Sequence, residues 1–294
     1  MRRTHVDLRD CDSPIRTQDY EEADVPILAE LLFAAELVLL HATPLYYGLG
    51  IPHGDDSAVV VIPGFLCPDV YLTPLHQWLA RIGYTPFFSG IGFNAECPNL
   101  LIKRQLNETI EKALTKSGRK VHLIGHSLGG IIGRAIAAQR PGDIASVTTL
   151  GAPFRGTVAH RSILRAAEMV RNRILAKHSR AVLPDCYTGR CTCDFLESLS
   201  CAMPSSVLET AVYTESDGVV DWRYCKTDRP ESDFPVSGTH IGLAFNPAVY
   251  SIIAARLALV NSERKRRKRQ PSGTSPHRAE RVRKTRLITG EDRG

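Results

Sequence analysis

Apolar runs alternate with helical patterns over most of the chain, and this alternation constrains the fold more than any other feature of the sequence. The run Ala58 to Ile62 is apolar throughout, as expected of a strand that is buried on both faces of a parallel sheet. We expect further strands at 84–89, 120–124, 144–150 and 207–214, and helices at 71–82, 99–116, 128–139 and 247–259. This order predicts a doubly wound α/β fold, a mostly parallel sheet with helices on both faces.

The alternation also divides the chain into segments. Residues 1–23 are polar, and we expect them to be mobile. The folded domain is expected at 24–262, beginning with a helix that Asp24 caps and that runs to about His41. Residues 155–205 interrupt the sheet pattern, and we expect this insert to form a cap, or lid, over the site. Its helical segment at 161–176 has one apolar face, formed by Ile163, Leu164, Ala167, Val170 and Ile174.

Positive charge is concentrated at the C-terminal end. The stretch 264–294 holds 12 of the 37 Lys and Arg residues but 3 of the 31 Asp and Glu residues, so the rest of the chain has a slight excess of acid. The folded domain therefore gives no electrostatic reason to expect nucleic-acid binding. We expect the tail 263–294 to be disordered and suited to contact with an anionic surface.

Targeting signals are not recognisable in the sequence. The first residues lack the apolar core of a signal peptide. The stretch 25–40 is apolar, but it is short for a membrane span and contains Glu30 and Glu36. We interpret it as an amphipathic or buried helix, with an interfacial helix that touches lipid as the alternative. A cytoplasmic protein is expected, with membrane contact limited to the periphery.

The eight cysteines leave several interpretations open. Four of them lie between 186 and 201, and without an export signal we expect reduced thiols. A zinc site in this cluster is an alternative, although Cys-x-Cys is not the usual spacing of zinc ligands. A local disulfide is another alternative if the compartment is oxidising.

The segment Gly125-His126-Ser127-Leu128-Gly129-Gly130 contains the pattern Gly-x-Ser-x-Gly. Alone this pattern is weak, but here it follows an expected strand and opens an expected helix, which is the context of a nucleophile elbow. The two glycines remove side chains that would clash in such a tight turn. Ser127 is therefore the candidate nucleophile, and the helix beginning behind it favours developing negative charge.

A second turn, Pro63-Gly64-Phe65, ends the earlier strand at the place where an oxyanion hole is expected. The backbone N–H groups of Phe65 and Leu128 are the candidates to hold the oxyanion. An ordinary strand-ending Pro-Gly turn is the alternative for this segment.

The candidate base and acid follow in the order expected after such a serine. His240 stands just before the last helix and is the candidate base, while His160 and His178 lie in the insert. Asp217 is the first Asp after the strand 207–214 and is the candidate acid, with Asp221 and Glu215 as alternatives. We expect Asp221 to pair with a neighbour such as Arg223.

Taken together, these segments resemble bacterial lipase/esterase-like α/β-hydrolases. The resemblance covers roughly residues 25–260, and the segments that carry it are 46–52, 61–65, 125–130, 150–157, 217–222 and 240–243. The run Gly-Ala-Pro-Phe-Arg-Gly-Thr at 151–157 looks like the stretch that leads into the lid of bacterial triacylglycerol lipases. The resemblance implies an α/β-hydrolase fold with a triad of Ser127, Asp217 and His240, and an oxyanion hole at Phe65 and Leu128.

These residues predict a serine hydrolase that cleaves a small-molecule or lipid carboxylic ester through an acyl-enzyme on Ser127. The chemistry requires no metal and no organic cofactor. An acyltransferase that passes the acyl group to an alcohol is the alternative, because it uses the same triad. A binding module without activity is a third hypothesis, which a missing triad member would favour.

Overall fold

The computed structural model describes residues 18–178 and 193–269. The chain divides into two compact units, Met1–Val260 and Asn261–Gly294. The first unit contains all the candidate catalytic and oxyanion-hole residues.

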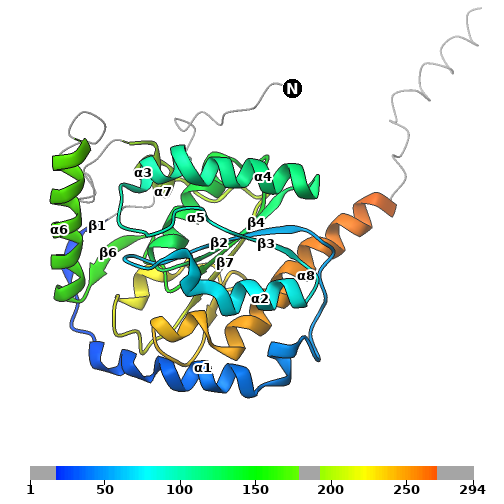
Figure 1. Cartoon of the computed structure of the whole chain (residues 1–294), viewed down its shortest axis with the longest axis horizontal. Helices are drawn as coiled ribbons and strands as arrows, with labels where there is room; N and C mark the ends of the chain where they lie inside the picture. The colour runs from blue at the N-terminus through cyan, green and yellow to red at the C-terminus, as the bar shows by residue number, and fades with distance from the viewer. Residues whose placement is uncertain (1–17, 179–192, 270–294) are drawn as a thin grey trace, which may run out of the picture. The chain divides into compact units, whose positions relative to one another are not determined.

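A parallel sheet of six strands lies at the centre of the first unit (Figure 1). Its strand order is β3-β2-β4-β5-β7-β8, and every neighbouring pair is parallel. The strands are β2 (Ala58–Ile62), β3 (Thr85–Phe88), β4 (Val121–His126), β5 (Ile144–Leu150), β7 (Leu208–Tyr213) and β8 (Asp233–Pro235). The predicted α/β-hydrolase fold class is confirmed by this arrangement.

Helices cover both faces of the sheet, and the side chains of β2 show how the two layers are divided. Val60 and Ile62 belong to one core, whereas Val59 and Val61 belong to the other, as the two-residue period of a strand requires. The first core is shared with α4 (Asn107–Ser117), α5 (Leu128–Gln139) and α7 (Asp194–Ser200). The second is shared with α1 (Phe33–Ala42), α2 (Thr73–Arg81) and the part of α8 (Pro247–Arg269) up to Leu257 (Figure 1).

Several predicted boundaries are confirmed. The helix that follows the elbow and the next strand have the predicted limits, Leu128–Gln139 and Ile144–Leu150. The helix expected at 99–116 is divided into α3 (Pro98–Leu101), a π-helical segment (Ile102–Leu106) and α4. The described part also contains short 3-10 helices: η2 (Ile27–Leu32), η3 (Pro44–Tyr47), η4 (Asp69–Leu72), η6 (Trp222–Cys225) and η7 (Ile241–Ala244).

The N-terminal segment differs from the prediction. Residues Gln18–Glu22 form β1, which pairs in parallel with β6 (Gly156–Ala159), so this part of 1–23 is a strand. Strands pair through backbone hydrogen bonds, whatever the polarity of their side chains. The polar composition of this segment therefore did not indicate a strand. Asp24 does not cap a helix, because η2 begins at Ile27 with Pro26 as its N-cap residue.

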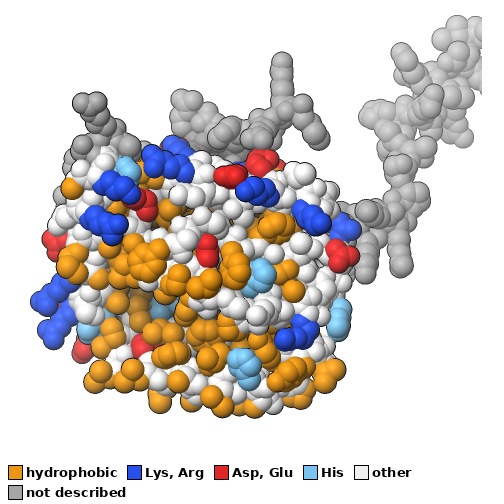
Figure 2. Space-filling view, viewed as in Figure 1, with side chains coloured by type: hydrophobic (Ala, Val, Ile, Leu, Met, Phe, Trp, Pro, Cys, Tyr) orange, Lys and Arg blue, Asp and Glu red, His pale blue; other side chains and the backbone are white. Residues whose placement is uncertain are grey.

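The apolar stretch that follows forms η2 and α1 instead of the single amphipathic or buried helix that was expected, and it is only partly buried. In η2 the leucines point outward, with Leu28 80% and Leu31 73% exposed, whereas Glu30 is buried at 5%. Figure 2 shows hydrophobic side chains gathered where α1 lies in Figure 1. Within the residues that the structure describes, no helix has the length and apolar character needed to cross a membrane.

The final helix is longer than predicted. We expected it to end at Leu259 and the tail to be disordered from residue 263, but α8 continues to Arg269. Lys and Arg are good helix formers, so a basic sequence can extend a helix that a packed segment has begun. The rest of the basic tail, 270–294, lies outside the described residues.

Candidate active site

Ser127 lies in a strained turn between β4 and α5. Its backbone has φ 51° and ψ −123°, a conformation that a residue with a side chain rarely adopts. The turn is closely packed, because a Cβ at Gly125 would lie 2.2 Å from the carbonyl oxygen of Gly129. A Cβ at Gly129 would lie 2.2 Å from the carbonyl oxygen of Ile62. Both glycines are therefore required to bring α5 this close to the sheet.

The turn after β2 lies beside Ser127, as the register of the sheet dictates. Ile62 pairs with Gly125, and a Cβ at Gly64 would lie 3.3 Å from the Cβ of Ser127. Leu128 is the first residue of α5, where helical geometry leaves the backbone N–H without a partner. Within the described residues, the N–H of Phe65 also has no hydrogen-bond partner. The structure thus brings two free N–H groups and a serine to one edge of the sheet.

Asn94, which no local sequence pattern indicates, holds this turn in place. Its side-chain amide donates a hydrogen bond of 2.8 Å to the carbonyl oxygen of Pro63. Its backbone carbonyl accepts from the N–H of Leu66, and its own N–H donates to the carbonyl of Cys67. Asn94 is fully buried, so these bonds tie residues 63–67 to the loop after β3.

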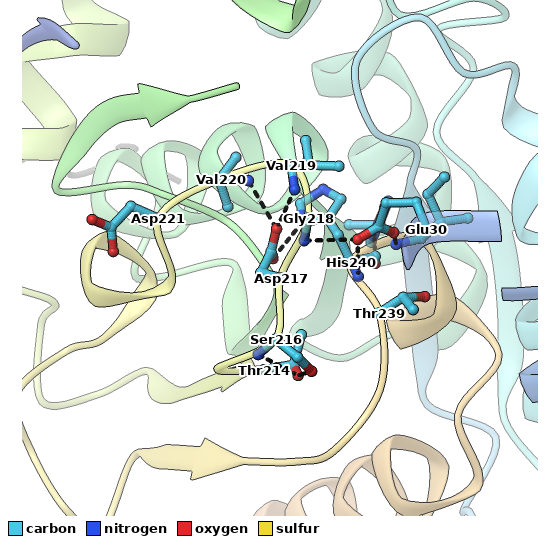
Figure 3. A network of polar contacts seen from close by, with 12 residues as sticks. Glu30, Thr214, Ser216, Asp217, Gly218, Val219, Val220, Asp221, Thr239 and His240 are labelled. Carbon is cyan, nitrogen blue, oxygen red and sulfur yellow. Dashed lines mark hydrogen bonds and ion pairs between the residues drawn. The ribbon is translucent and has the colours of Figure 1, made fainter. Parts of the chain in front are cut away.

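His240 and Asp217 form a buried hydrogen-bonded pair. Asp217 follows β7, and its Oδ2 accepts a hydrogen bond of 2.7 Å from Nδ1–H of His240. The other oxygen of Asp217 accepts from the backbone N–H groups of Val219 and Val220, each at 2.8 Å (Figure 3). The carboxylate is thereby fixed with one oxygen directed at the imidazole.

Burial and the neighbouring negative charges shift the pKa of His240 in opposite directions. Burial lowers its pKa, but the negative charge of Asp217, the hydrogen bond to that carboxylate and the charge of Glu30 raise it. The net effect is a pKa above the ordinary value for histidine. Such an environment stabilises an imidazolium, the state that a general base reaches when it accepts a proton.

The alternative acids are engaged elsewhere or exposed. Asp221 accepts from Nε and Nη2 of Arg223, as expected from the sequence, and the hydrogen bond to this guanidinium lowers the pKa of Asp221. Glu215 has an exposed side chain. Of the three carboxylates, Asp217 is the one that the structure brings to His240.

His126 is packed against the ring of His240. The ring centroids of the two histidines lie 5.0 Å apart, and Nε2–H of His126 donates to the backbone carbonyl of His240 at 2.9 Å. Burial and the neighbouring His240 lower the pKa of His126 to about 3, so its ring is neutral. No described hydrogen bond joins the Ser127 hydroxyl to His240; such bonds are often long before substrate is present.

The insert contacts segments on two sides of the site. Ile163 and Leu164, at the beginning of α6 (Arg161–His178), pack with Val220 next to the Asp217 turn. Further along α6, Ile174 packs with Leu100 of α3, which follows the loop of Asn94. The cap over Ser127 stays a prediction, and part of it, 179–192, lies outside the described residues.

The cysteine cluster is only partly described, since Cys186 and Cys191 lie outside the described residues. Cys201 is disulfide-bonded, so the expectation of reduced thiols does not hold for it. Among the residues that the structure describes, no group of three or more His, Cys, Asp or Glu side chains is placed to hold a metal ion.

The sheet and the placement of the candidate site residues on it agree with one fold. Its serine, aspartate and histidine follow β4, β7 and β8 in that order, which is the chain order of the α/β-hydrolases, and its serine occupies their strand-to-helix elbow. The chain has the α/β-hydrolase fold. A family model described as alpha/beta hydrolase fold matches residues 94–184, a segment that includes the elbow.

Two bacterial lipases share a short stretch with the chain. Triacylglycerol lipases of Pseudarthrobacter phenanthrenivorans and Burkholderia plantarii are each 48% identical to it over 54 residues, which is 18% of this chain. The stretch covers 17% and 15% of the two lipases, so the chain matches about a sixth of their length.

Two solved structures of ester-cleaving enzymes are remotely similar to the chain. The naproxen esterase of Bacillus subtilis is 13% identical, covers 71% of this chain and 86% of its own, and has a TM-score of 0.41. The monoacylglycerol lipase of Paleococcus ferrophilus is 15% identical, covers 70% of this chain and 97% of its own, and has a TM-score of 0.46.

Proposed function

We propose that the protein is a serine hydrolase that cleaves carboxylic esters through an acyl-enzyme on Ser127. The observation that carries this proposal is the buried pair of His240 and Asp217 at the sheet edge where the strained Ser127 lies. The short lipase-like stretch supports an ester as the substrate, because triacylglycerols are carboxylic esters.

In the proposed mechanism, His240 takes the proton of the Ser127 hydroxyl while the serine oxygen attacks the ester carbonyl. The N–H groups of Phe65 and Leu128 donate to the resulting oxyanion, assisted by the positive end of α5. Asp217 fixes the ring of His240 and stabilises its protonated form. His240 then gives its proton to the leaving alcohol, and water attacks the acyl-enzyme with His240 again as base.

The test is hydrolysis of p-nitrophenyl esters from acetate to palmitate by the wild type and by Ser127→Ala. We expect turnover and fluorophosphonate labelling in the wild type, and neither in the variant, because the attacking oxygen is gone. Ser162→Ala is the matched control, since this serine lies on α6 and its hydroxyl is hydrogen-bonded to His160. Labelling of a folded Ser127→Ala protein would show that the nucleophile is another residue.

The same acyl-enzyme can in principle transfer its acyl group to an alcohol. Repeating the reaction with glycerol as acceptor and analysing the products distinguishes the two fates. A hydrolase releases mainly free acid under these conditions, whereas an acyltransferase forms mainly the glycerol ester.

A further inference from the structure

Glu30 is a buried carboxylate in η2, where the leucines are exposed. Only 5% of its surface is accessible, and burying a charge is costly unless it is paired or hydrogen-bonded. Both of its oxygens are occupied: Oε1 accepts from the backbone N–H groups of Gly218 and His240 at 2.8 and 3.0 Å. Oε2 accepts from the N–H of Ile241 at 2.8 Å.

These three N–H groups belong to the two loops that carry the acid and the base. Gly218 follows Asp217 directly, and His240 is the base itself. One carboxylate therefore joins the turn after β7 to the loop before η7, and it does so within one residue of each catalytic side chain. The hydrogen bond from His240 to Asp217 depends on the relative position of these same two loops.

The Glu30 carboxylate can approach the turn after β7 because residue 218 is a glycine, and a larger side chain there would not fit. A Cβ at Gly218 would lie 2.7 Å from Oε1 of Glu30 and 2.7 Å from the carbonyl oxygen of Pro26. The backbone of Gly218 does not have a positive φ, so close contact rather than backbone conformation requires glycine here.

Glu36 provides a second attachment further along the same segment. Its carboxylate accepts from the hydroxyl of Thr239 at 2.7 Å, next to His240. A Cβ at Gly242 would lie 1.5 Å from Oε2 of Glu36, so that glycine also makes room for a carboxylate. Two glutamates of one apolar segment thus hold the loop of the base.

We propose that Glu30 is a positioning residue of the active site, which holds the loops of Asp217 and His240 in register and stabilises the protonated imidazole by its charge. This inference rests on the proposed function, because it assigns Glu30 a role in the same proton transfers. The hydrogen bonds act on geometry, and the carboxylate charge acts on the protonation of His240.

The charged and titratable groups around His240 determine what removal of Glu30 does to its pKa. Asp217 from the turn after β7 and Glu30 from η2 both raise it, while burial lowers it. His126 from the end of β4 is neutral, and Tyr71 of η4 contacts the carbonyl of Ile241 through its hydroxyl. With Asp217 left in place, loss of the Glu30 charge lowers the pKa of His240.

The experiment compares Glu30→Gln with Glu215→Gln, a matched control that removes an exposed carboxylate from the same region. The rate of fluorophosphonate labelling and kcat/KM for a short ester are measured against pH. Glu30→Gln is expected to move the ascending limb to lower pH and to reduce kcat on the order of 10²-fold, the effect of a small displacement of catalytic groups. Glu215→Gln is expected to leave both unchanged.

A second variant, Gly218→Ala, keeps the charge but forces the Glu30 carboxylate away from the acid turn. We expect a comparable fall in kcat with little movement of the pH limb. If Glu30→Gln fails to fold, Gly218→Ala tests whether Glu30 positions the two loops. A folded Glu30→Gln protein with the wild-type pH limb and kcat would overturn the inference, as would a folded Gly218→Ala protein with wild-type kcat.

Failure of the proposed function gives a different result. In that case the wild type itself shows no labelling and no turnover that depends on Ser127. The inference about Glu30 is tested only by the variants relative to an active wild type, so the two failures are distinguishable.

Discussion

Replacing Asp217 by asparagine tests the candidate triad with almost no change in shape. The carboxylate is buried, and three N–H groups point at it: two backbone groups at one oxygen and the imidazole at the other. An asparagine side chain has one oxygen and one NH2 group in their place. Whichever way the amide is turned, one set of N–H groups meets a donor.

The hydrogen bonds determine how the asparagine amide is oriented and how large the loss of turnover is. Keeping the oxygen toward Val219 and Val220 preserves two bonds of 2.8 Å, so the NH2 group faces His240. Nδ1 must then accept, which places the remaining ring proton on Nε2, the nitrogen that has to take the serine proton. In serine proteases with a Ser-His-Asp triad, the same Asp-to-Asn change favours this wrong tautomer and lowers kcat about 10⁴-fold, or about 5 kcal/mol.

The assay is turnover of a short p-nitrophenyl ester, with thermal unfolding of each variant measured alongside. Asp221→Asn is the control, because this carboxylate is paired with the exposed Arg223 and is four residues away in sequence. Solvent weakens an ion pair with an exposed arginine, and its loss leaves the hydrogen bond between His240 and Asp217 in place, so we expect near wild-type turnover.

A reversed ranking of the two variants would refute the assignment of Asp217. A larger loss of turnover in a folded Asp221→Asn protein would assign the acid to Asp221. Equal and small losses in both variants would show that His240 does not need an acid partner at Asp217.

Three further predictions concern pH and the tail. Because the net pKa of His240 is raised and the base must be neutral to accept a proton, kcat/KM is expected to rise with pH through a midpoint above about 6.5, as a pH–rate profile will show. The same shift stabilises the folded protein below about pH 6.5, and this contribution is lost as pH rises through the folded-state pKa. Removing 264–294 is expected to leave turnover of a short soluble ester and the melting temperature nearly unchanged; a large fall in melting temperature would contradict this.

The parts of the fold that local sequence determines were predictable. The elbow is encoded by Gly125, Ser127 and Gly129 between an apolar strand and a helix, and the structure has that helix at the predicted residues. The chain order of Ser127, Asp217 and His240 was also visible, because the serine and the acid each stand just after an apolar run and the base stands just before the last helix. The hydrogen bond between His240 and Asp217 is then possible because parallel strands end at one edge of the sheet.

Contacts between distant segments were not predictable from local pattern. Asn94 supports the turn at Pro63 from another loop, and nothing in its neighbourhood indicates this. In η2 the burial is the reverse of what side-chain polarity suggests, because Glu30 faces the loops of Asp217 and His240 and Leu28 faces outward. The sequence did contain one signal for these contacts, the two acidic residues Glu30 and Glu36 inside an apolar stretch, because a charge in such a place needs hydrogen-bond partners.

The hydrogen bonds of Glu30 join residues that are far apart in the sequence, and this separation affects the order in which the protein folds. They join residues 188 to 211 positions apart, which makes them some of the most non-local contacts in the molecule. Closing such a long loop is slow relative to local helix formation, so these bonds are expected to form late. Fluorophosphonate labelling during refolding would then lag behind the recovery of helical circular dichroism, and enzymatic competence would report the last docking step of the chain.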